Sequence, residues 1–161
     1  MSVRFATITI AYIVFSTTSF AQVTVNNKDI TGIWKTIDDE EGRTKSHVQI
    51  YKKGENYHGK IVKLIDPQIL KDAEKERFED VTCDECPDNR GKDKPLLGLE
   101  MLWGMKKLAD KYAEGEIMDP KTGKIYDCTL WLDASDPSGN TLKLRGWILF
   151  LYRTQTWYRV Q

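Results

Sequence analysis

The sequence predicts an all-β domain in which short antiparallel strands form a sandwich or a closed barrel. From Ile30 onward, apolar and polar residues alternate with a period of two much more often than with the period of a helix. Turn residues separate these segments at short intervals, so that neighbouring segments can pair as hairpins. The chain has 161 residues, which suits one domain with a core of its own.

The alternation and the turns place the strands. Lys-Lys-Gly-Glu at 52–55 and Pro-Lys-Thr-Gly at 120–123 are typical of tight turns. The expected strands are 30–37, 46–51, 56–65, 113–119, 124–132, 141–150 and 153–160. Residues 95–108 allow a further strand with two glycine bends or a short helix, and we favour the strand.

Two segments depart from this pattern. Residues 1–21 contain one charge, Arg4, and an eleven-residue apolar run from Phe5 to Phe15 that is followed by small residues. This pattern predicts a signal peptide cleaved after Ala21, because the run is well short of the ~20 residues of a spanning helix. We therefore expect an exported, periplasmic or extracellular domain at 22–161, without integral membrane association.

The second segment is a charged excursion at residues 66–95, in which 16 of 30 residues are charged. We expect it to be a long surface loop or short helix inserted after the third strand. It is either a lid at the rim of a barrel or a mobile insertion.

Charge and motifs exclude several classes of function. The chain has 24 basic and 24 acidic residues, and loss of Arg4 leaves 23 basic residues and a net charge of about −1. A nucleic-acid partner is not expected, since no basic patch is free of acids. No phosphate loop, G-x-S-x-G elbow or H-E-x-x-H helix occurs, and no cofactor or metal is expected. Asp119 and Asp127 are better explained by turn chemistry than by catalysis.

The three cysteines suggest a structural disulfide. Cys83 and Cys86 lie in the excursion among acidic residues, which raise a thiol pKa and disfavour a reactive thiolate. We favour a Cys83–Cys86 disulfide with Cys128 as a buried free thiol. Pairing of Cys128 with either of the others, and a redox or metal role, remain as alternatives.

Aromatic and arginine residues on the strands are the best candidates for a binding site. A buried arginine must be paired or stacked, and a buried tryptophan needs one partner for its N–H. In the last strand Arg153, Gln155, Trp157 and Arg159 share one face, although the pattern does not say whether it is the inner one. The candidates for a cavity or its mouth are Trp34, Trp103, Tyr126, Arg145, Arg153, Gln155 and Trp157.

Several segments together resemble a known family, the bacterial domain of unknown function 2147. The most specific are Asp-Pro-x-x-Gly-Lys-x-Tyr at 119–126, Leu-x-Leu-Arg-Gly ending at Gly146, and Arg-Thr-Gln-x-Trp at 153–157. The Cys-x-x-Cys is similar to that of one branch of the family. The resemblance implies an exported protein with a small antiparallel barrel similar to lipocalins and other calycins, and no established reaction or ligand.

The lipocalin likeness also implies a particular contact. Lipocalins place a Gly-x-Trp on the first strand, and a basic side chain of the last strand packs over that indole. Here Gly32–Trp34 matches the motif, and either Arg153 or Arg159 would supply the cation.

We therefore expect an exported, non-catalytic barrel that binds a small, partly apolar or anionic molecule, with its mouth near the excursion. The alternatives are an envelope protein-interaction module with a solid barrel, and a thiol-redox protein that uses Cys83 and Cys86.

Overall fold

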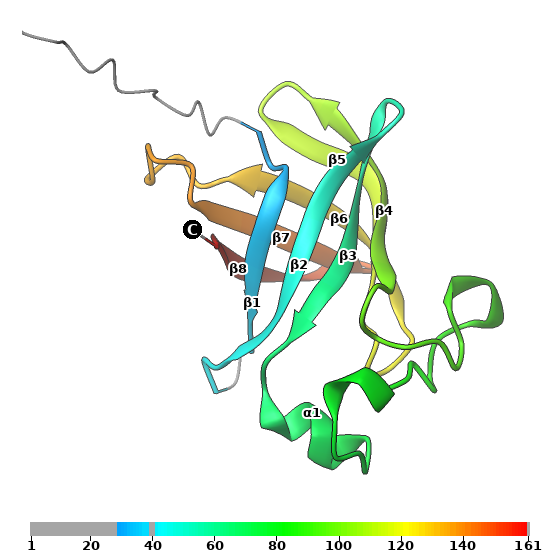
Figure 1. The fold of residues 1–161 in the computed structure, drawn as a ribbon. Coiled ribbons are helices and arrows are strands. Elements are labelled where there is room, and N and C mark those ends of the chain that lie inside the picture. Colours follow the sequence, from blue (N-terminus) through cyan, green and yellow to red (C-terminus); the bar gives the residue numbers. More distant parts are fainter. Residues whose placement is uncertain (1–28, 39–40, 161) are drawn as a thin grey trace, which may run out of the picture.

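Eight antiparallel strands, each paired with its neighbours in sequence, close into a barrel (Figure 1). The computed structural model describes residues 29–38 and 41–160, so the expected signal peptide lies outside the described residues. The strands are β1 (Gly32–Ile37), β2 (Thr44–Lys53), β3 (Asn56–Leu64), β4 (Glu100–Leu108), β5 (Lys111–Met118), β6 (Ile125–Leu132), β7 (Thr141–Ile148) and β8 (Leu151–Arg159). The predicted antiparallel barrel is confirmed, and the segment 95–108 supplies β4.

The inward-facing side chains of the strands form the core. An eight-stranded barrel is just wide enough for its own side chains to fill, and alternate residues of each strand point inward. The largest fully buried side chains are two tryptophans and a set of aliphatic and sulfur-containing residues: Trp34, Trp157, Ile30, Ile50, Leu102, Met105, Met118, Leu130, Leu142, Val48, Val81 and Cys83. In β8, the face that carries Gln155, Trp157 and Arg159 is therefore the inner one.

One end of the barrel is closed by Arg159. Its guanidinium carbon lies 4.2 Å from the centre of the Trp34 ring. Its two terminal nitrogens donate hydrogen bonds to the carbonyl oxygens of Thr31 (2.6 Å) and Asp29 (2.8 Å), and Nε donates to that of Gly139 (3.2 Å). Arg159, and not Arg153, is therefore the cation of the lipocalin-like contact.

Gly32 is required by the same contact. A Cβ at this position would lie 2.6 Å from Nη1 of Arg159, and the φ of +129° disfavours any residue with a side chain. The first glycine of the Gly-x-Trp motif therefore makes room for the arginine that covers the indole.

The excursion between β3 and β4 folds against the opposite end of the barrel. It contains α1 (Pro67–Asp72) and the short 3₁₀ helices η1 (Phe78–Asp80) and η2 (Asp88–Arg90). Asp66 caps α1 by accepting a hydrogen bond from the Gln68 amide, and Pro67 begins the helix without needing a backbone donor. Ile69, Leu70, Ala73 and Phe78 pack against the core. The helix is only six residues long because the apolar spacing ends at Ala73.

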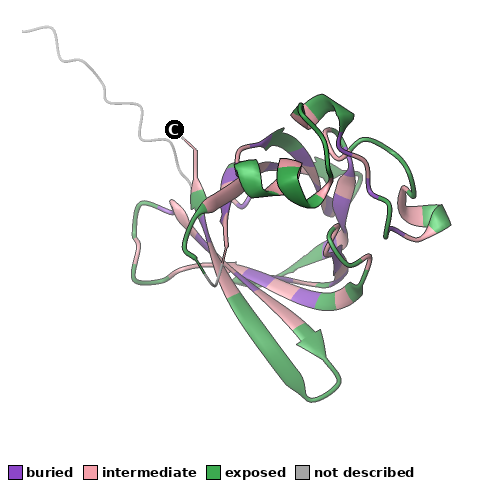
Figure 2. Cartoon of the chain, turned by 90° about the horizontal axis from the view of Figure 1, so that it is seen from below, coloured by how far each residue is buried: buried purple, intermediate pink, exposed green. Residues whose placement is uncertain are grey.

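The barrel is closed by few pairs where β1 meets β8. The registered pairs there are Trp34 with Arg159 and Lys35 with Tyr158. β7 and β8, in contrast, pair along their whole length, from Thr141 with Tyr158 to Ile148 with Leu151. The β7–β8 hairpin consequently leaves the ring of strands and projects from it as an exposed arm (Figure 2).

Candidate functional site at the barrel mouth

The inward-facing side chains become more exposed from the closed end to the excursion end. In β8, Trp157 is buried, Gln155 is half-buried and Arg153 is exposed. In β6, Leu130 and Cys128 are buried, whereas Tyr126 is half-buried. In a barrel filled along its whole length these inner positions would all be buried. At the excursion end, the inner side chains of β6 and β8 are thus partly exposed to water, and we call this end the mouth.

The mouth is lined by polar groups that lie on a buried apolar floor. Trp157 Nε1 donates a hydrogen bond to Gln155 Oε1 over 3.3 Å. Across the barrel, the hydroxyls of Thr36 and Ser46 are 2.8 Å apart and hydrogen-bonded, and both residues are buried. The two hydroxyls thus satisfy each other below the surface of the mouth.

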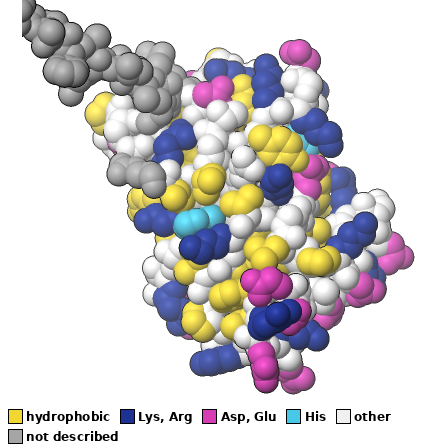
Figure 3. All heavy atoms as spheres, in the orientation of Figure 1, with side chains coloured by type: hydrophobic (Ala, Val, Ile, Leu, Met, Phe, Trp, Pro, Cys, Tyr) yellow, Lys and Arg dark blue, Asp and Glu magenta, His cyan; other side chains and the backbone are white. Residues whose placement is uncertain are grey.

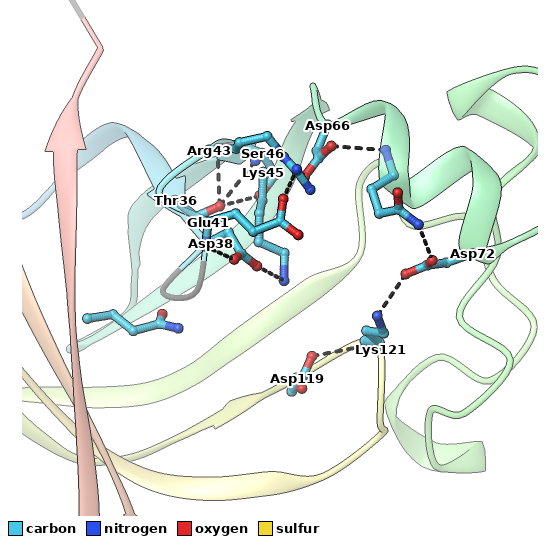
Figure 4. Close-up of polar contacts among 12 residues, drawn as sticks. Thr36, Asp38, Glu41, Arg43, Lys45, Ser46, Asp66, Asp72, Asp119 and Lys121 are labelled. Atoms are coloured by element: carbon cyan, nitrogen blue, oxygen red, sulfur yellow. Dashed lines mark hydrogen bonds and ion pairs between the residues drawn. The ribbon is translucent and has the colours of Figure 1, made fainter.

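Charged side chains of the connections form the rim of the mouth (Figure 4). Arg43 Nε, beyond β1, lies 3.3 Å from Asp66 Oδ2 at the start of α1. Lys121 Nζ, in the β5–β6 turn, lies 2.7 Å from Asp72 Oδ2 at the end of α1. The hydrogen bond from Lys121 lowers the pKa of Asp72. These two contacts fasten α1 to the turns on either side of it.

A hollow lies outside the barrel, between the excursion and β4. It has a volume of about 360 Å³ and is lined by Asp88, Asn89, Arg90, Gly91, Lys94, Leu99, Glu100 and Trp103. The Arg90 guanidinium carbon is 4.2 Å from the centre of the Trp103 ring, and its Nη2 is 2.7 Å from Glu116 Oε2. Acidic and basic side chains intermix over the excursion (Figure 3). Arg90 is thus already stacked and paired, and the hollow has no single sign of charge.

Glu100, at one edge of this hollow, joins two side chains of the outer sheet face. It accepts a hydrogen bond from the Tyr51 hydroxyl and lies 3.0 Å from His58 Nδ1. Burial raises the pKa of Glu100, but the contacts from Tyr51 and His58 outweigh it, so that the pKa lies below its ordinary value. Burial and the same carboxylate raise the pKa of Tyr51 to about 12.

The seven candidate residues from the sequence fall into four places. Tyr126 on β6, and Arg153 and Gln155 on β8, lie on inward-facing positions toward the mouth. Trp34 and Trp157 lie in the buried core below it. Trp103 lines the outer hollow. Arg145 is on the outer sheet face, where its Nε donates to Thr154 Oγ1 over 3.0 Å, so it is not inside the barrel.

Sequence reasoning missed Thr36 and Ser46 in the mouth, and Arg90 and Glu100 in the outer hollow. Thr36 could have been found, because a period of two from the buried Trp34 places it on the inner face. Arg90 could not, because nothing in a charged loop indicates which of its side chains will stack on a strand.

Cys83 and Cys86 form a disulfide, and Cys128 is free and buried. The disulfide is buried with Leu99 and Met118, and the Cys83 sulfur lies 3.4 Å from the Pro120 carbonyl oxygen. It thus holds the excursion against the β5–β6 turn, a position that suits a structural bond better than a redox centre. Burial, and to a smaller extent the negative charges of Asp127 and Glu116, raise the pKa of Cys128 to about 12.

Among residues 29–38 and 41–160, no three His, Cys, Asp or Glu side chains gather in a way that could hold a metal ion. Within the same ranges, no helix has the length and apolar character needed to cross a membrane.

The closed eight-stranded barrel and its arginine-covered tryptophan define a lipocalin-like fold. A solved structure with this fold is protein HP1028 from Helicobacter pylori, described as belonging to the lipocalin family. It superposes with a TM-score of 0.63 at 15% identity, over 83% of this chain and 84% of that one. The chain belongs to the family DUF2147, described as uncharacterized protein conserved in bacteria, whose model matches residues 32–159. No curated protein matches it.

Proposed function

We propose that this protein is an exported binding protein that takes up a small, partly apolar molecule with an acidic or carbonyl-bearing head at the barrel mouth. The observation that carries the proposal is the gradient along the inner face of β6–β8. The inner residues change from apolar and buried to polar and exposed, ending in Tyr126, Gln155 and Arg153. A ligand there would place its apolar part on the core and its head beside Arg153 and Gln155, which follow one another on the inner face of β8, with Tyr126 further out on β6.

The chemistry of the three residues defines the class of ligand. Arg153 offers a planar set of N–H donors suited to a carboxylate or phosphate. Gln155 and Tyr126 add neutral groups that can donate or accept. The likeness of the barrel to a lipocalin-family structure supports a binding role.

The test uses dodecanoate as the probe, with dodecanol as its uncharged counterpart. We expect dodecanoate to bind the purified protein more tightly than dodecanol, as measured by calorimetry. Replacing Gln155 or Arg153 by alanine should each weaken dodecanoate binding about tenfold, since a hydrogen bond to a charged group contributes roughly 1.5 kcal/mol or more.

Gln49→Ala is the matched control, because Gln49 lies on β2 with its side chain on the opposite, outward face. It should leave dodecanoate binding unchanged. Native mass spectrometry of the protein from its producing cells would reveal a bound natural molecule. The proposal fails if neither probe binds and no molecule is carried, or if both mouth variants bind like the unmodified protein.

A further inference from the structure

The tip of the β7–β8 hairpin carries a run of exposed apolar residues. Trp147 to Tyr152 reads Trp-Ile-Leu-Phe-Leu-Tyr, six large apolar side chains without a charge. All six are exposed, and the two at the turn are almost fully so, Leu149 by 91% and Phe150 by 85%. Single exposed apolar residues are common on protein surfaces, but a continuous run on a projecting arm marks a binding surface.

The turn itself breaks the usual preference for turn residues. Leu149 has a φ of +55°, a conformation that tight hairpins normally give to glycine or asparagine. A branched apolar side chain is disfavoured there and gains nothing from burial, since it is exposed. Folding alone therefore does not account for leucine at this position, whereas contact with an apolar partner does.

Behind the tip, the side chains follow a fixed order along the hairpin. The rings of Trp147 and Tyr152 come next, with their centres 5.3 Å apart. Arg145 follows on the same face, and its guanidinium carbon lies 4.3 Å from the centre of the Tyr152 ring. Arg153 occupies the adjacent position on the other face, opposite Gly146. The order is apolar, then aromatic, then cationic.

This order matches the layers of a membrane surface, where acyl chains, the amphipathic interface and the phosphates succeed one another. We propose that the β7–β8 hairpin docks the protein on a membrane rich in anionic lipids, with Leu149 and Phe150 among the acyl chains and Arg145 and Arg153 at the phosphates. The protein would rest on the bilayer through this arm and would not span it.

The charge of the hairpin favours a bilayer over a second copy of the chain. From Thr141 to Val160 the sequence has four basic residues and no acidic one, in a protein with equal numbers of both. Lys143 is paired with Asp133 and Arg159 lies at the closed end, so Arg145 and Arg153 are the cations next to the tip. A symmetric contact between two hairpins would bring these like charges together. An anionic lipid surface supplies the opposite charge to both.

Membrane docking goes beyond ligand binding at the mouth, and of the residues named for the two functions only Arg153 belongs to both. The β7–β8 turn lies at the same end of the barrel as the excursion, because both are connections that follow an odd-numbered strand. A docked hairpin would therefore hold the mouth near the membrane.

The first experiment measures co-sedimentation of the full chain with vesicles. We expect binding to vesicles of equal parts phosphatidylglycerol and phosphatidylcholine, and much weaker binding to phosphatidylcholine alone. The double change Leu149→Asn and Phe150→Gly gives the turn its favoured residues, so the hairpin keeps its fold and loses its apolar tip. It should bind at least tenfold more weakly. Arg145→Gln and Arg153→Gln should each weaken binding about fivefold.

Leu108→Asn is the matched control, since Leu108 is an exposed leucine at the opposite end of the barrel. A second readout places a polarity-sensitive dye on Phe150→Cys or, as its control, on Glu55→Cys. The dye goes to the new thiol because the native cysteines are disulfide-bonded or buried. Anionic vesicles should shift the emission to the blue at position 150 only.

Equal binding by the tip variant and the unmodified protein, without an emission shift at position 150, would overturn the proposal. If the unmodified protein does not bind vesicles but forms dimers, and the tip variant is monomeric, the partner of the hairpin is a second copy of the chain and not a membrane. Because Gln155→Ala leaves the hairpin intact, loss of ligand binding in that variant with normal vesicle binding would separate the two proposals.

Discussion

Arg159 on β8 covers the ring of Trp34 on β1 with its guanidinium group and so links the last strand of the barrel to the first. The same group donates hydrogen bonds to three backbone carbonyl oxygens, of which two belong to Asp29 and Thr31 just before β1. One side chain thus fixes the first strand, the last strand and the β6–β7 loop. The contact belongs to the architecture of the closed end, far from the mouth.

Replacing Arg159 should therefore cost much stability. We expect Arg159→Ala to lower the free energy of unfolding by about 3 kcal/mol, because three carbonyl oxygens lose a charged donor and the indole loses its cover. In Arg159→Lys, the compact ammonium group cannot span the three carbonyl oxygens that the guanidinium contacts. This variant should therefore recover less than half of the lost free energy of unfolding. Urea unfolding measures both variants, and an exposed-site control, Arg153→Ala, should change stability by less than about 0.5 kcal/mol.

The disulfide should stabilise the excursion without supporting a thiol reaction. The double change Cys83→Ser and Cys86→Ser removes the disulfide and its constraint on the unfolded chain. Because the loop that it closes is very short, the free energy of unfolding should fall by only roughly 2 kcal/mol. Limited proteolysis should then cut within residues 66–95 before it cuts the barrel. A thiol-oxidoreductase activity in the native protein that this variant loses would favour the redox alternative.

The thiol of Cys128 should be inert in the folded protein. Burial raises its pKa to about 12, so at pH 8 it is protonated and shielded from solvent. A thiol-specific dye should react with Cys128 only after unfolding. Because the folded state keeps this proton while the unfolded state loses it near pH 9, stability should fall as the pH rises from about 9 to 12. Cys128→Ala should reduce this alkaline loss.

Tyr51 should report on its contact with Glu100. Glu100→Gln removes the carboxylate charge and should lower the pKa of Tyr51 from about 12. Burial remains in that variant, so the pKa should stay above the ordinary value of a phenol. The chain has seven tyrosines, so NMR of the tyrosine rings, with the Tyr51 signal assigned through Tyr51→Phe, gives the pKa of Tyr51 in both proteins. An unchanged titration in Glu100→Gln would show that burial alone sets the pKa of Tyr51.

The alternation of side chains was sufficient to predict antiparallel strands in a sandwich or a barrel, because each strand buries one face and exposes the other. The resemblance to the family then favoured the barrel. The end of β7 shows where the alternation fails. The expected strand 141–150 runs two residues too far, since Leu149 and Phe150 continue the apolar pattern through a turn that lacks turn residues. A period of two also could not tell inside from outside in this hairpin, where both faces carry large side chains, and Arg145 was consequently expected in the cavity.

The mouth was predictable only in part. Tyr126 and Gln155 were among the sequence candidates, and both lie on inner positions of their strands. The charged rim of the mouth was not predicted, because Lys121 and Asp72 are 49 positions apart in the sequence and only the closed barrel brings them together. The excursion likewise packs on the core through a few apolar residues that its high charge obscures.

The order of the strands has a consequence for how proteins of this design can diversify. All connections that follow odd-numbered strands lie at one end: the β1–β2 turn, the excursion, the β5–β6 turn and the apolar hairpin tip. Each can lengthen, shorten or change its side chains without disturbing the tryptophan and arginine that secure the other end. Selection for a new cargo or a new docking surface can thus act on one end of the molecule while folding is safeguarded by the other.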